Sequence, residues 1–585
     1  MIILYALLLP LCSAIFAAFY SFSQRNIYVG FMSSFTILLS FLCSLLGLFA
    51  FAGFNVSIPL GSWIGEMNVN FGILIDNLSL VMMSLVTFVA TCVHFYSIFY
   101  MQNDECFNKY FAFLGLFVFC MLILVLSDNF LFLFLGWEGV GLCSWLLIGF
   151  WYQQKANSKA ANEAFIMNRI SDFAMLLALF LIYLNFGDFR YEIVFDSLFS
   201  QIVNPSVLSL IAALLFIGAM GKSAQFPFHT WLANAMAGPT PVSALLHAAT
   251  MVTAGVFLLI RANALFMQNI NFYVSLVGAF TALFAAILAS NSKDLKRIIA
   301  FSTLSQLGYM FAACGMGAYN LAFFHLVIHA FFKALLFLGA GNIMHSTNEL
   351  NIYKMGNLYK SLKITAIFMM IGSLALSGIY PFAGFFSKDK IIDFAFFNSH
   401  YIIFAVLLFS AFLTAFYSFR LITLVFFAPS KNDEPSHDAS KLALFSMTPL
   451  VVLALFGGLL EGFFIKKIEH NYILIAISLI VICSGIILAF IRYKNGANYN
   501  ELGFLANECK INELYDLVFV KSFFKISKSL ANFEENLFRV FFEKPKYIIS
   551  LLNKIKTKND SLSLNIIFVA SFLGILILIW WCANA

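Results

Sequence analysis

Residues 221–256 read GKSAQFPFHTWLANAMAGPTPVSALLHAATMVTAGV, and Lys222 and His247 lie within this largely apolar stretch. Gly221 precedes the lysine and Pro227 follows it, so we expect a helix to break there, as helices do where irregular backbone lines a site inside a membrane. A charged side chain near the bilayer centre is energetically costly, which makes Lys222 a candidate functional group. The stretch predicts a helical membrane protein with an interrupted helix at this lysine.

The composition of the whole chain agrees with a membrane protein. Of 585 residues, 62% are hydrophobic and 11% are charged, with a mean hydropathy of +0.92. A soluble domain is about half apolar and about a quarter charged. We therefore exclude a soluble enzyme, a nucleic-acid binder and a disordered protein, and we attribute the net charge of +6 to cytoplasmic loops.

The sequence contains no pattern that would bind a redox cofactor. The ten cysteines lie singly, without the close spacing of an iron–sulfur site. Neither the dinucleotide-binding pattern G-x-G-x-x-G nor a phosphate-binding loop is present. We expect this chain to carry no cofactor and no metal.

About sixteen apolar segments are long enough to cross a bilayer, which takes about 20 residues in a helix. The first begins at Met1 without a basic leader, and we interpret it as a retained span rather than a signal peptide. The twelfth is long and interrupted. The predicted spans are residues 1–20, 29–53, 77–100, 109–127, 129–150, 163–186, 206–223, 241–260, 273–291, 299–316, 318–343, 361–398, 402–427, 443–464, 471–491 and 563–582.

Lysine and arginine concentrate in alternate loops between these spans. The sparse set of loops carries only Arg190, Arg261, Lys466 and Lys467. By the positive-inside rule the other set is cytoplasmic, so both termini are predicted to be periplasmic. The basic residues of the cytoplasmic set are Arg25, Lys109, Lys155, Lys159, Lys293, Lys296, Arg297, Lys354, Lys360, Lys363, Lys431 and Lys441.

Residues 511–556 have the pattern of a surface helix. Apolar residues recur at steps of three and four, and the opposite face is charged, which is typical of a helix lying along a surface. Unbroken, it would be roughly 70 Å long, although Pro545 predicts a kink. An interfacial anchor and a strap against neighbouring subunits fit equally well. The stripe comprises Phe519, Phe523, Ile526, Leu530, Phe533, Leu537 and Val540.

Ionisable residues inside the predicted spans are candidate functional groups, because lipid disfavours charge. Three of them, on one predicted helix, share a face at steps of four. Alternating acidic, basic and imidazole groups suit a proton relay across the membrane midplane. The candidates are Glu138, Arg169, Asp172, Lys222, His247, the stripe His325, His329 and Lys333, and Lys388 and Asp389.

Each candidate also has a structural interpretation. Glu138 and Lys222 could form a purely structural ion pair, and Arg169 could pair locally with Asp172, three residues along the same helix. His247 could be an ordinary core histidine. The spacing of His325 and His329 is that of a helical zinc site, but Lys333 would repel a metal cation. The cluster at residues 388–390 could simply be a helix end.

Several motifs together resemble those of the antiporter-like subunits of respiratory complex I. The strongest is residues 221–256, and the resemblance covers residues from about 60 to 400. The surface helix and the final span resemble those of the distal antiporter-like subunit. The other matching motifs are residues 137–150, 168–172, 302–309, 329–337 and 384–389.

The resemblance implies an all-α polytopic fold with two inverted five-helix repeats, each with a broken helix. It also implies a lateral amphipathic helix and a terminal anchor. On this basis we expect N-terminal helices at 1–108, the first repeat at 109–260, the second at 261–428, two further helices at 429–492, the lateral helix region at 493–562 and the anchor at 563–585.

The resemblance also implies roles for the candidates. Glu138 and Lys222 match the coupling pair, with Arg169 and Asp172 as an accessory pair. Lys333 matches the central lysine, with His247, His325 and His329 beside it. Lys388 and Asp389 match the exit-side pair. Lys390 departs from the family, many members of which carry an acid there, and this leaves the exit's electrostatics open.

Quinone reduction elsewhere in such a complex is expected to drive proton movement through this chain. Flavin and iron–sulfur centres would belong to partner subunits. The implied partners are the other membrane-arm subunits, especially the neighbouring antiporter-like subunit through residues 511–556, in a bacterial inner membrane. The lateral helix is expected on the cytoplasmic side.

Three other functions remain open from the sequence. The large subunit of a multisubunit Na⁺/H⁺ antiporter shares the core, although it usually continues into further C-terminal spans, which we do not expect here. A mostly structural arm whose long helix clamps its neighbours is a second alternative. A subunit of a membrane hydrogenase complex is a third, related one.

Overall fold

The computed structural model describes residues 1–21, 24–65, 69–199, 203–266, 268–429, 437–465, 471–496, 503–506, 508–539, 546 and 569–574. The chain divides into two units, Met1–Asn507 and Glu508–Ala585, which are described separately.

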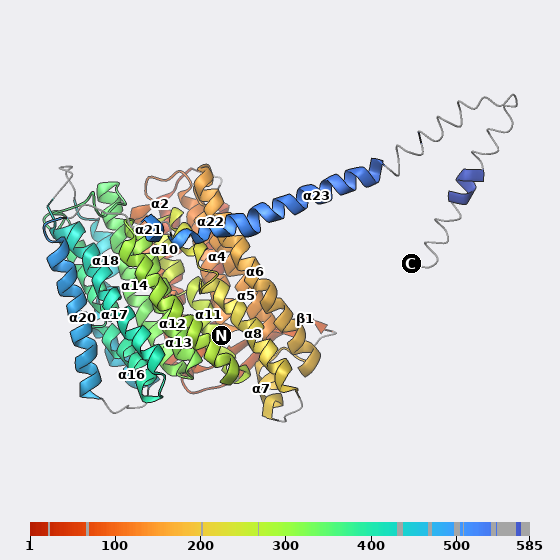
Figure 1. The fold of residues 1–585 in the computed structure, drawn as a ribbon, viewed down its shortest axis with the longest axis horizontal. Coiled ribbons are helices and arrows are strands. Elements are labelled where there is room, and N and C mark those ends of the chain that lie inside the picture. The colour runs from red at the N-terminus through yellow and green to blue at the C-terminus, as the bar shows by residue number, and fades with distance from the viewer. Residues whose placement is uncertain are drawn as a thin grey trace. The chain divides into compact units, whose positions relative to one another are not determined.

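Long helices that run side by side build the first unit (Figure 1). Among the described residues, fourteen helical segments are long and apolar enough to cross a membrane, and they match the predicted spans to within a few residues, apart from an earlier start of the sixth. Helices of the first half are α1 (Ile2–Phe19), α2 (Ile27–Phe51), α3 (Asn77–Tyr100), α4 (Phe107–Leu126), α5 (Phe130–Ile148), α6 (Lys155–Phe186), α7 (Tyr191–Phe199), α8 (Pro205–Lys222), α9 (Thr230–Asn234), α10 (Thr240–Ala248) and α11 (Ala254–Arg261).

The second half of this unit continues the same arrangement. Its helical elements are α12 (Gln268–Asn291), α13 (Leu295–Gly315), α14 (Tyr319–Thr347), α15 (Lys363–Ser377), the π-helix η5 (Phe385–Asp389), α16 (Lys390–Phe397), α17 (Tyr401–Ile422), the π-helix η6 (Thr423–Phe427), α18 (Lys441–Phe456), the 3₁₀ turn η7 (Gly457–Leu460), α19 (Glu461–Phe464), α20 (Tyr472–Tyr493) and α21 (Gly503–Ala506).

Both predicted helix interruptions are confirmed. Helix α8 ends at Lys222, and irregular backbone leads from it to α9. The predicted span at 361–398 divides into α15 and the η5–α16 segment, and Gly378 ends α15 with a φ of +85°, which favours glycine. Each predicted repeat therefore contains one broken helix that carries a lysine.

Side-chain caps explain where several helices begin. Asp76, Asn129 and Asp294 each accept a hydrogen bond from the backbone N–H three residues further on. Such caps satisfy amides that the first turn of a helix leaves without partners.

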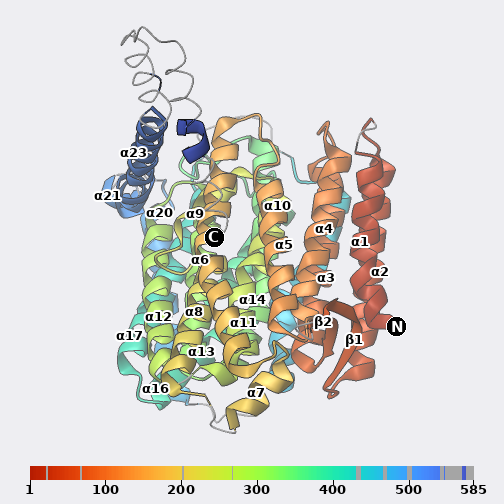
Figure 2. The ribbon, with the colours of Figure 1, turned by 90° about the vertical axis from the view of Figure 1, so that its right-hand side faces the viewer.

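Three of the spans are wholly enclosed by other helices: α10 with α11, α13 and α14. Helix α14 packs against α3, α10, α13, α15 and α18, and therefore lies at the centre of the bundle (Figure 2). The outer helices instead expose large apolar side chains such as Phe180, Leu184 and Ile402, as expected of surfaces that contact lipid. The enclosed helices are the ones that can hold polar groups away from lipid.

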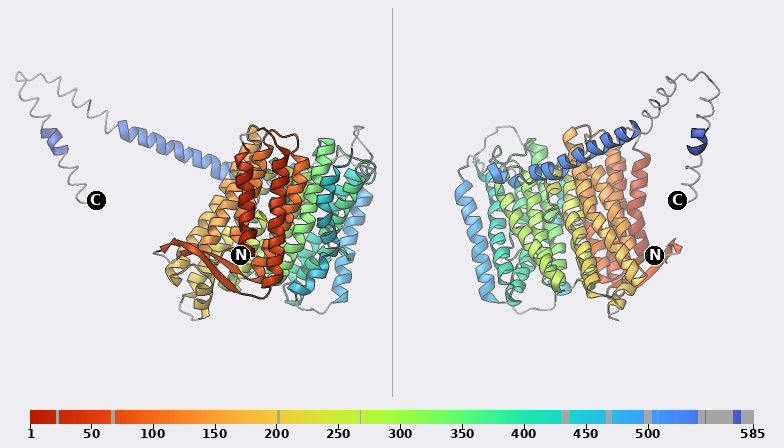
Figure 3. Two further views of the ribbon diagram at one scale, coloured as in Figure 1. Left: turned by 180° about the vertical axis from the view of Figure 1, so that it is seen from behind. Right: turned by 45° about the vertical axis from the view of Figure 1, so that its right-hand side comes forward.

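A two-stranded antiparallel hairpin lies at one end of the bundle, near α1 and α2 (Figure 3). It consists of β1 (Val56–Ile64) and β2 (Val69–Ile75), which the all-helical prediction did not include. β2 packs against α3, α4 and α5 and buries several of its residues, whereas β1 covers it and is exposed. The hairpin escaped the prediction because it falls in a loop between two spans.

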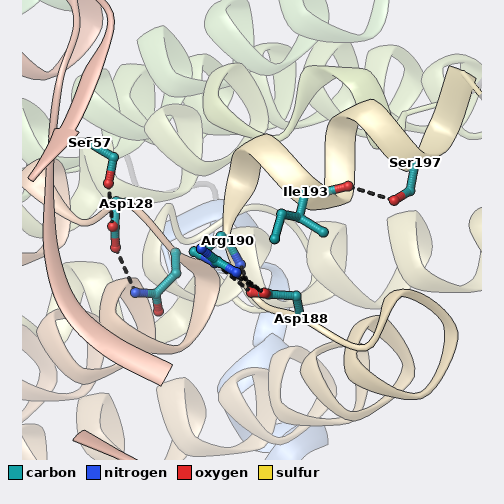
Figure 4. A network of polar contacts seen from close by, with 7 residues as sticks. Ser57, Asp128, Asp188, Arg190, Ile193 and Ser197 are labelled. Atoms are coloured by element: carbon teal, nitrogen blue, oxygen red, sulfur yellow. Dashed lines mark hydrogen bonds and ion pairs between the residues drawn. The ribbon is translucent and has the colours of Figure 1, made fainter. Parts of the chain in front are cut away.

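Polar contacts tie this hairpin to the helix ends (Figure 4). Asp128 accepts hydrogen bonds from Ser57 Oγ at 2.6 Å and from Asn129 Nδ2 at 2.7 Å. Nearby, Arg190 donates to Asp188 at 2.6 Å. Although partial burial would raise the pKa of Asp188, its hydrogen bonds with Arg190 hold that pKa below its ordinary value.

The second unit contains the predicted surface helix in part. Helix α22 (Ile511–Tyr515), the π-helix η9 (Asp516–Val520) and α23 (Lys521–Phe538) follow one another without a break, and the apolar stripe from Phe519 to Leu537 is exposed on this unit. Val540, Pro545 and most of residues 540–556 lie outside the described residues, as does the predicted final span at 563–582 except for 569–574. The lateral placement of this helix stays a prediction.

Candidate functional site

Two ion pairs connect α5, α6 and α8. Lys222, the last residue of α8, places its Nζ 3.2 Å from Oδ2 of Asp172, and both side chains are almost fully buried. Arg169 pairs with Glu138, and these two side chains are 44% and 18% exposed. The inner pair is therefore shielded from the surroundings, whereas the outer pair lies at the edge of the bundle.

This pairing corrects the expected one, in which Glu138 pairs with Lys222 and Arg169 with Asp172. Residues three apart on a helix point about 60° away from each other. Asp172 points toward the close contact of α6 with α8, while Arg169 points along the edge of α6 toward Glu138 of α5. The four charges still form one cluster, because Glu138 lies within electrostatic reach of both Asp172 and Lys222.

Helix α5 shapes the space around Lys222. Trp137 donates a hydrogen bond from Nε1 to Oδ1 of Asp172 at 2.6 Å, and its ring lies 5.7 Å from Lys222 Nζ. Gly141, one turn further along α5, leaves room for the amine, since a Cβ there would come within 2.9 Å of Nζ. The amine of Lys222 therefore contacts a carboxylate on one side and an indole face on another.

His247 lies in the enclosed helix α10, one residue before that helix ends. It is fully buried against Phe337, with ring centroids 4.9 Å apart. Neither ring nitrogen has a hydrogen-bond partner among the described residues. Buried polar atoms are normally paired, so His247 does not have the environment of an ordinary core histidine.

The stripe on α14 is completely buried and faces α13. Lys333 donates to Ser302 Oγ, and His325 bonds Gln306 through Nε2 at 3.0 Å. Lys333 lies within electrostatic reach of His325, His329 and His247. The stripe thus links the helix that carries His247 to the second half of the bundle.

The far end of this stripe reaches the second broken helix. Nδ1 of His325 lies 2.9 Å from the hydroxyl of Ser387, which is the residue before Lys388. Lys388 is buried, and its Nζ lies 5.1 Å from the centre of the Tyr309 ring, with no hydrogen-bond partner among the described residues. Both ring nitrogens of His325 are engaged, which leaves none of its lone pairs directed at a metal.

Lys390, the departure from the family pattern, has a specific partner. Its Nζ lies 2.7 Å from Oε1 of Glu461 in α19. The additional positive charge next to Lys388 and Asp389 is therefore balanced by a carboxylate from a distant part of the chain. No sequence signal pointed to Glu461, which stands near the end of a predicted span.

The predicted site residues thus fall into three groups, of which the middle and the far ones are linked through His325 with Ser387 and through Lys333 with Lys388. Glu138, Arg169, Asp172 and Lys222 form one cluster, His247 with the α14 stripe forms the middle, and Lys388 with Asp389 forms the far cluster. The polar partners Ser302 and Gln306 were not among the candidates predicted from the sequence. Their spacing of four residues in an apolar helix was the available signal.

Comparison with known proteins gives a consistent family. Residues 127–414 match the family described as "NADH:quinone oxidoreductase/Mrp antiporter, TM", and residues 62–111 match "NADH-Ubiquinone oxidoreductase (complex I), chain 5 N-terminus". The chain is 53% identical to NADH-quinone oxidoreductase subunit L of Campylobacter jejuni, covering 99% of both chains. It is 49% identical to subunit L of Rickettsia typhi, covering 71% of this chain and 66% of that one.

A solved structure shares the fold. The structure of the Mrp complex from a Dietzia species contains a chain similar to this one with a TM-score of 0.75 and 24% identity, covering 98% of this chain and 62% of that chain. At this identity the likeness concerns the fold alone.

Proposed function

The chain belongs to the subunit L family of NADH-quinone oxidoreductase, and from this premise we propose that it is a proton-translocating, antiporter-like membrane subunit of such a complex. The observation that carries the proposal is the row of buried ionisable groups from Lys222 through Lys333 to Lys388. Buried charges in a membrane are retained where a function needs them, and proton relays are a common reason.

The geometry suggests how a proton would move along this row. Lys222 forms an ion pair with Asp172 beside the ring of Trp137. When that pair separates, the ammonium loses its counter-charge and gives up a proton to the next group in the row, His247 or Lys333. Each transfer between nitrogen atoms breaks one N–H bond and forms another, and the transfer to Asp389 forms an O–H bond, so a charge moves while the side chains stay within the bundle. The exit-side groups Lys388 and Asp389 receive it after Lys333.

The driving reaction belongs to other subunits in this proposal. Quinone reduction there would change the electrostatics at Glu138 and Lys222 and start the transfer. This chain would act as a non-redox subunit, with flavin and iron–sulfur centres in its partners. The exposed apolar stripe of α23 supports a contact between the lateral helix and a neighbouring antiporter-like subunit.

Within the bacterial inner membrane, we place the loops rich in lysine on the cytoplasmic side and both termini on the periplasmic side. The proposal rests on the excess of basic residues in alternate loops, together with the alternation of the spans.

Two substitutions test the function directly. In a complex that contains this chain as its subunit L, Glu138→Gln and Lys388→Met should each lower the number of protons pumped per quinone reduced, while the complex still assembles. The ratio is measured in inverted vesicles with a pH-sensitive dye and a parallel assay of quinol. Glu192→Gln and Lys159→Met are matched controls, because both side chains lie at the surface. Full pumping by both relay variants would contradict the proposal.

A Na⁺/H⁺ antiporter subunit is the alternative, and the shared fold of the Mrp-complex chain favours keeping it. Sodium uptake by vesicles from antiporter-deficient cells that express this chain distinguishes the two. Uptake that does not depend on quinone reduction would favour the antiporter.

A further inference from the structure

A charged cluster lies beyond Lys388 and Asp389 on the way to the end of the bundle. Asp393 follows Asp389 by four residues, so the two carboxylates stand one turn apart on the same helix face. Asp393 lies within electrostatic reach of both Asp389 and Lys390. Unlike Asp389, Asp393 is only partly buried. Helix α16 ends four residues later, at Phe397, and the exposed Asn398 begins the loop that follows.

Glu461 joins this cluster from another part of the chain because η7 packs closely against η5. A Cβ on Gly458 would come within 2.2 Å of the Phe386 ring, so glycine permits this approach. Glu461 begins the next short helix and reaches Lys390 at 2.7 Å. Its side chain is 22% exposed and that of Lys390 only 8%, so the carboxylate stands on the outer side of the pair.

The charges of the cluster do not balance. Among the described residues, this cluster combines two lysines, Lys388 and Lys390, with three carboxylates, those of Asp389, Asp393 and Glu461. With every group ionised, two positive charges meet three negative ones, which leaves one negative charge in surroundings that disfavour it. One additional proton, shared among the three carboxylates, makes the cluster neutral. Such a cluster is suited to accept one proton at a time.

The cluster lies at the end of the bundle opposite the lysine-rich loops. Lys441 begins α18 in such a loop, and α18 then crosses the bundle before Glu461. Helix α16 ends at the same end of the bundle as α7 and the hairpin (Figures 1 and 2). A proton that passes through the cluster would therefore leave on the side opposite the proposed cytoplasmic one.

We propose that Asp393 and Glu461 are exit groups that carry the proton from the Lys388–Asp389 pair to this end of the bundle, and that Lys390 positions Glu461. The inference rests on the proposed function. The ammonium of Lys388 gives a proton to the carboxylate of Asp389, which breaks an N–H bond and forms an O–H bond. The proton then passes to Asp393 or Glu461, directly or across a water, and finally to bulk water. Asp389 returns to its ionised form.

Amide variants of the two carboxylates test the exit role. Glu461→Gln and Asp393→Asn should each lower the protons pumped per quinone reduced as far as Lys388→Met does, because each removes a group that accepts and releases the proton. The pumping ratio is measured per assembled complex, with Glu192→Gln as the control. Lys390→Met should lower it as well, since Glu461 loses its partner, whereas Lys390→Arg should restore it.

A paired variant separates transport from bracing. Replacing a buried ion pair by apolar residues is often neutral for stability. The double variant Lys390→Met with Glu461→Met should therefore assemble but pump poorly. If it pumps at the wild-type ratio, the pair only braces α16 against α19 and the inference is wrong.

Lys388→Met separates this inference from the proposed function. If Glu461→Gln and Asp393→Asn pump fully while Lys388→Met does not, the exit assignment fails and the proposed function stands. If Lys388→Met also pumps fully, the proposed function itself fails.

Discussion

Lys222 and Lys388 occupy corresponding positions at the two broken helices, yet their charges are balanced differently. Lys222 has a carboxylate at 3.2 Å and an indole ring beside it. Lys388 lies over the Tyr309 ring, and its Nζ has no hydrogen-bond partner among the described residues. The ammonium of Lys222 is therefore paired directly with a carboxylate, whereas the Lys388 amine lies over an aromatic ring.

The crosswise pairing around Lys222 leads to a prediction at the scale of single residues. Asp172→Asn leaves a buried ammonium without a carboxylate, which commonly costs about 3–5 kcal/mol. Arg169→Gln removes a partly exposed partner, and such pairs are worth about 1 kcal/mol or less. We expect Asp172→Asn to reduce the amount of assembled subunit in membranes. It should also lower the temperature at which the solubilised complex loses this subunit. Arg169→Gln should change both quantities little. Equal effects of the two variants would contradict the pairing.

At the scale of elements, each broken helix brings a lysine to a point where the backbone leaves its regular path. Helix α8 ends at Lys222, and the π-helix η5 contains Lys388. The two lysines can therefore approach the enclosed helices α10, α13 and α14, which carry the remaining groups. The hairpin β1–β2 has a different role, because it covers the helix ends of the first half.

The attachment of the hairpin is testable with two serines of one strand. Ser57→Ala removes a hydrogen bond to the carboxylate of Asp128, and bonds to charged groups are worth about 1.5–3 kcal/mol. We expect a protease added to intact spheroplasts to cut the hairpin several-fold faster in this variant. Ser62→Ala is the matched control, since Ser62 is an exposed residue of the same strand. Equal cleavage rates would mean that Asp128 does not anchor the hairpin.

At the scale of the whole molecule, helix α14 connects the two halves because it contacts both the α10 segment and η5. Buried groups can pass charge across the bundle only if each group lies close enough to the next one for proton transfer or for electrostatic influence. The enclosure of α10, α13 and α14 keeps lipid away from these groups. The arrangement suits a subunit that receives a signal at one side and releases a proton elsewhere.

The orientation of the molecule is testable with a native cysteine. Cys106 is exposed in the loop between α3 and α4, beside Lys109, so it should react with a membrane-impermeant maleimide in inverted vesicles but not in intact spheroplasts. Asn398→Cys, in the loop after α16, should react in spheroplasts only. Labelling is read at each residue by mass spectrometry. The reverse pattern would invert the proposed topology.

Much of the architecture could be predicted from local properties of the chain. Runs of apolar residues predict spans because lipid excludes unsatisfied polar groups, and the fourteen spans and the interruptions at Lys222 and near Lys388 were predicted in this way. The hairpin was missed, since short strands in a loop have no comparably strong signal.

The sequence alone indicated the ionisable candidates from Glu138 to Asp389, because each of them interrupts an apolar run that can be recognised locally. Only the tertiary structure decided their partners: Lys222 with Asp172 and Arg169 with Glu138 instead of the reverse, and Lys390 with Glu461. The reason is physical. A pairing depends on how each helix is rotated about its axis and how closely its neighbours pack, and these are set by contacts among helices that lie far apart in the chain.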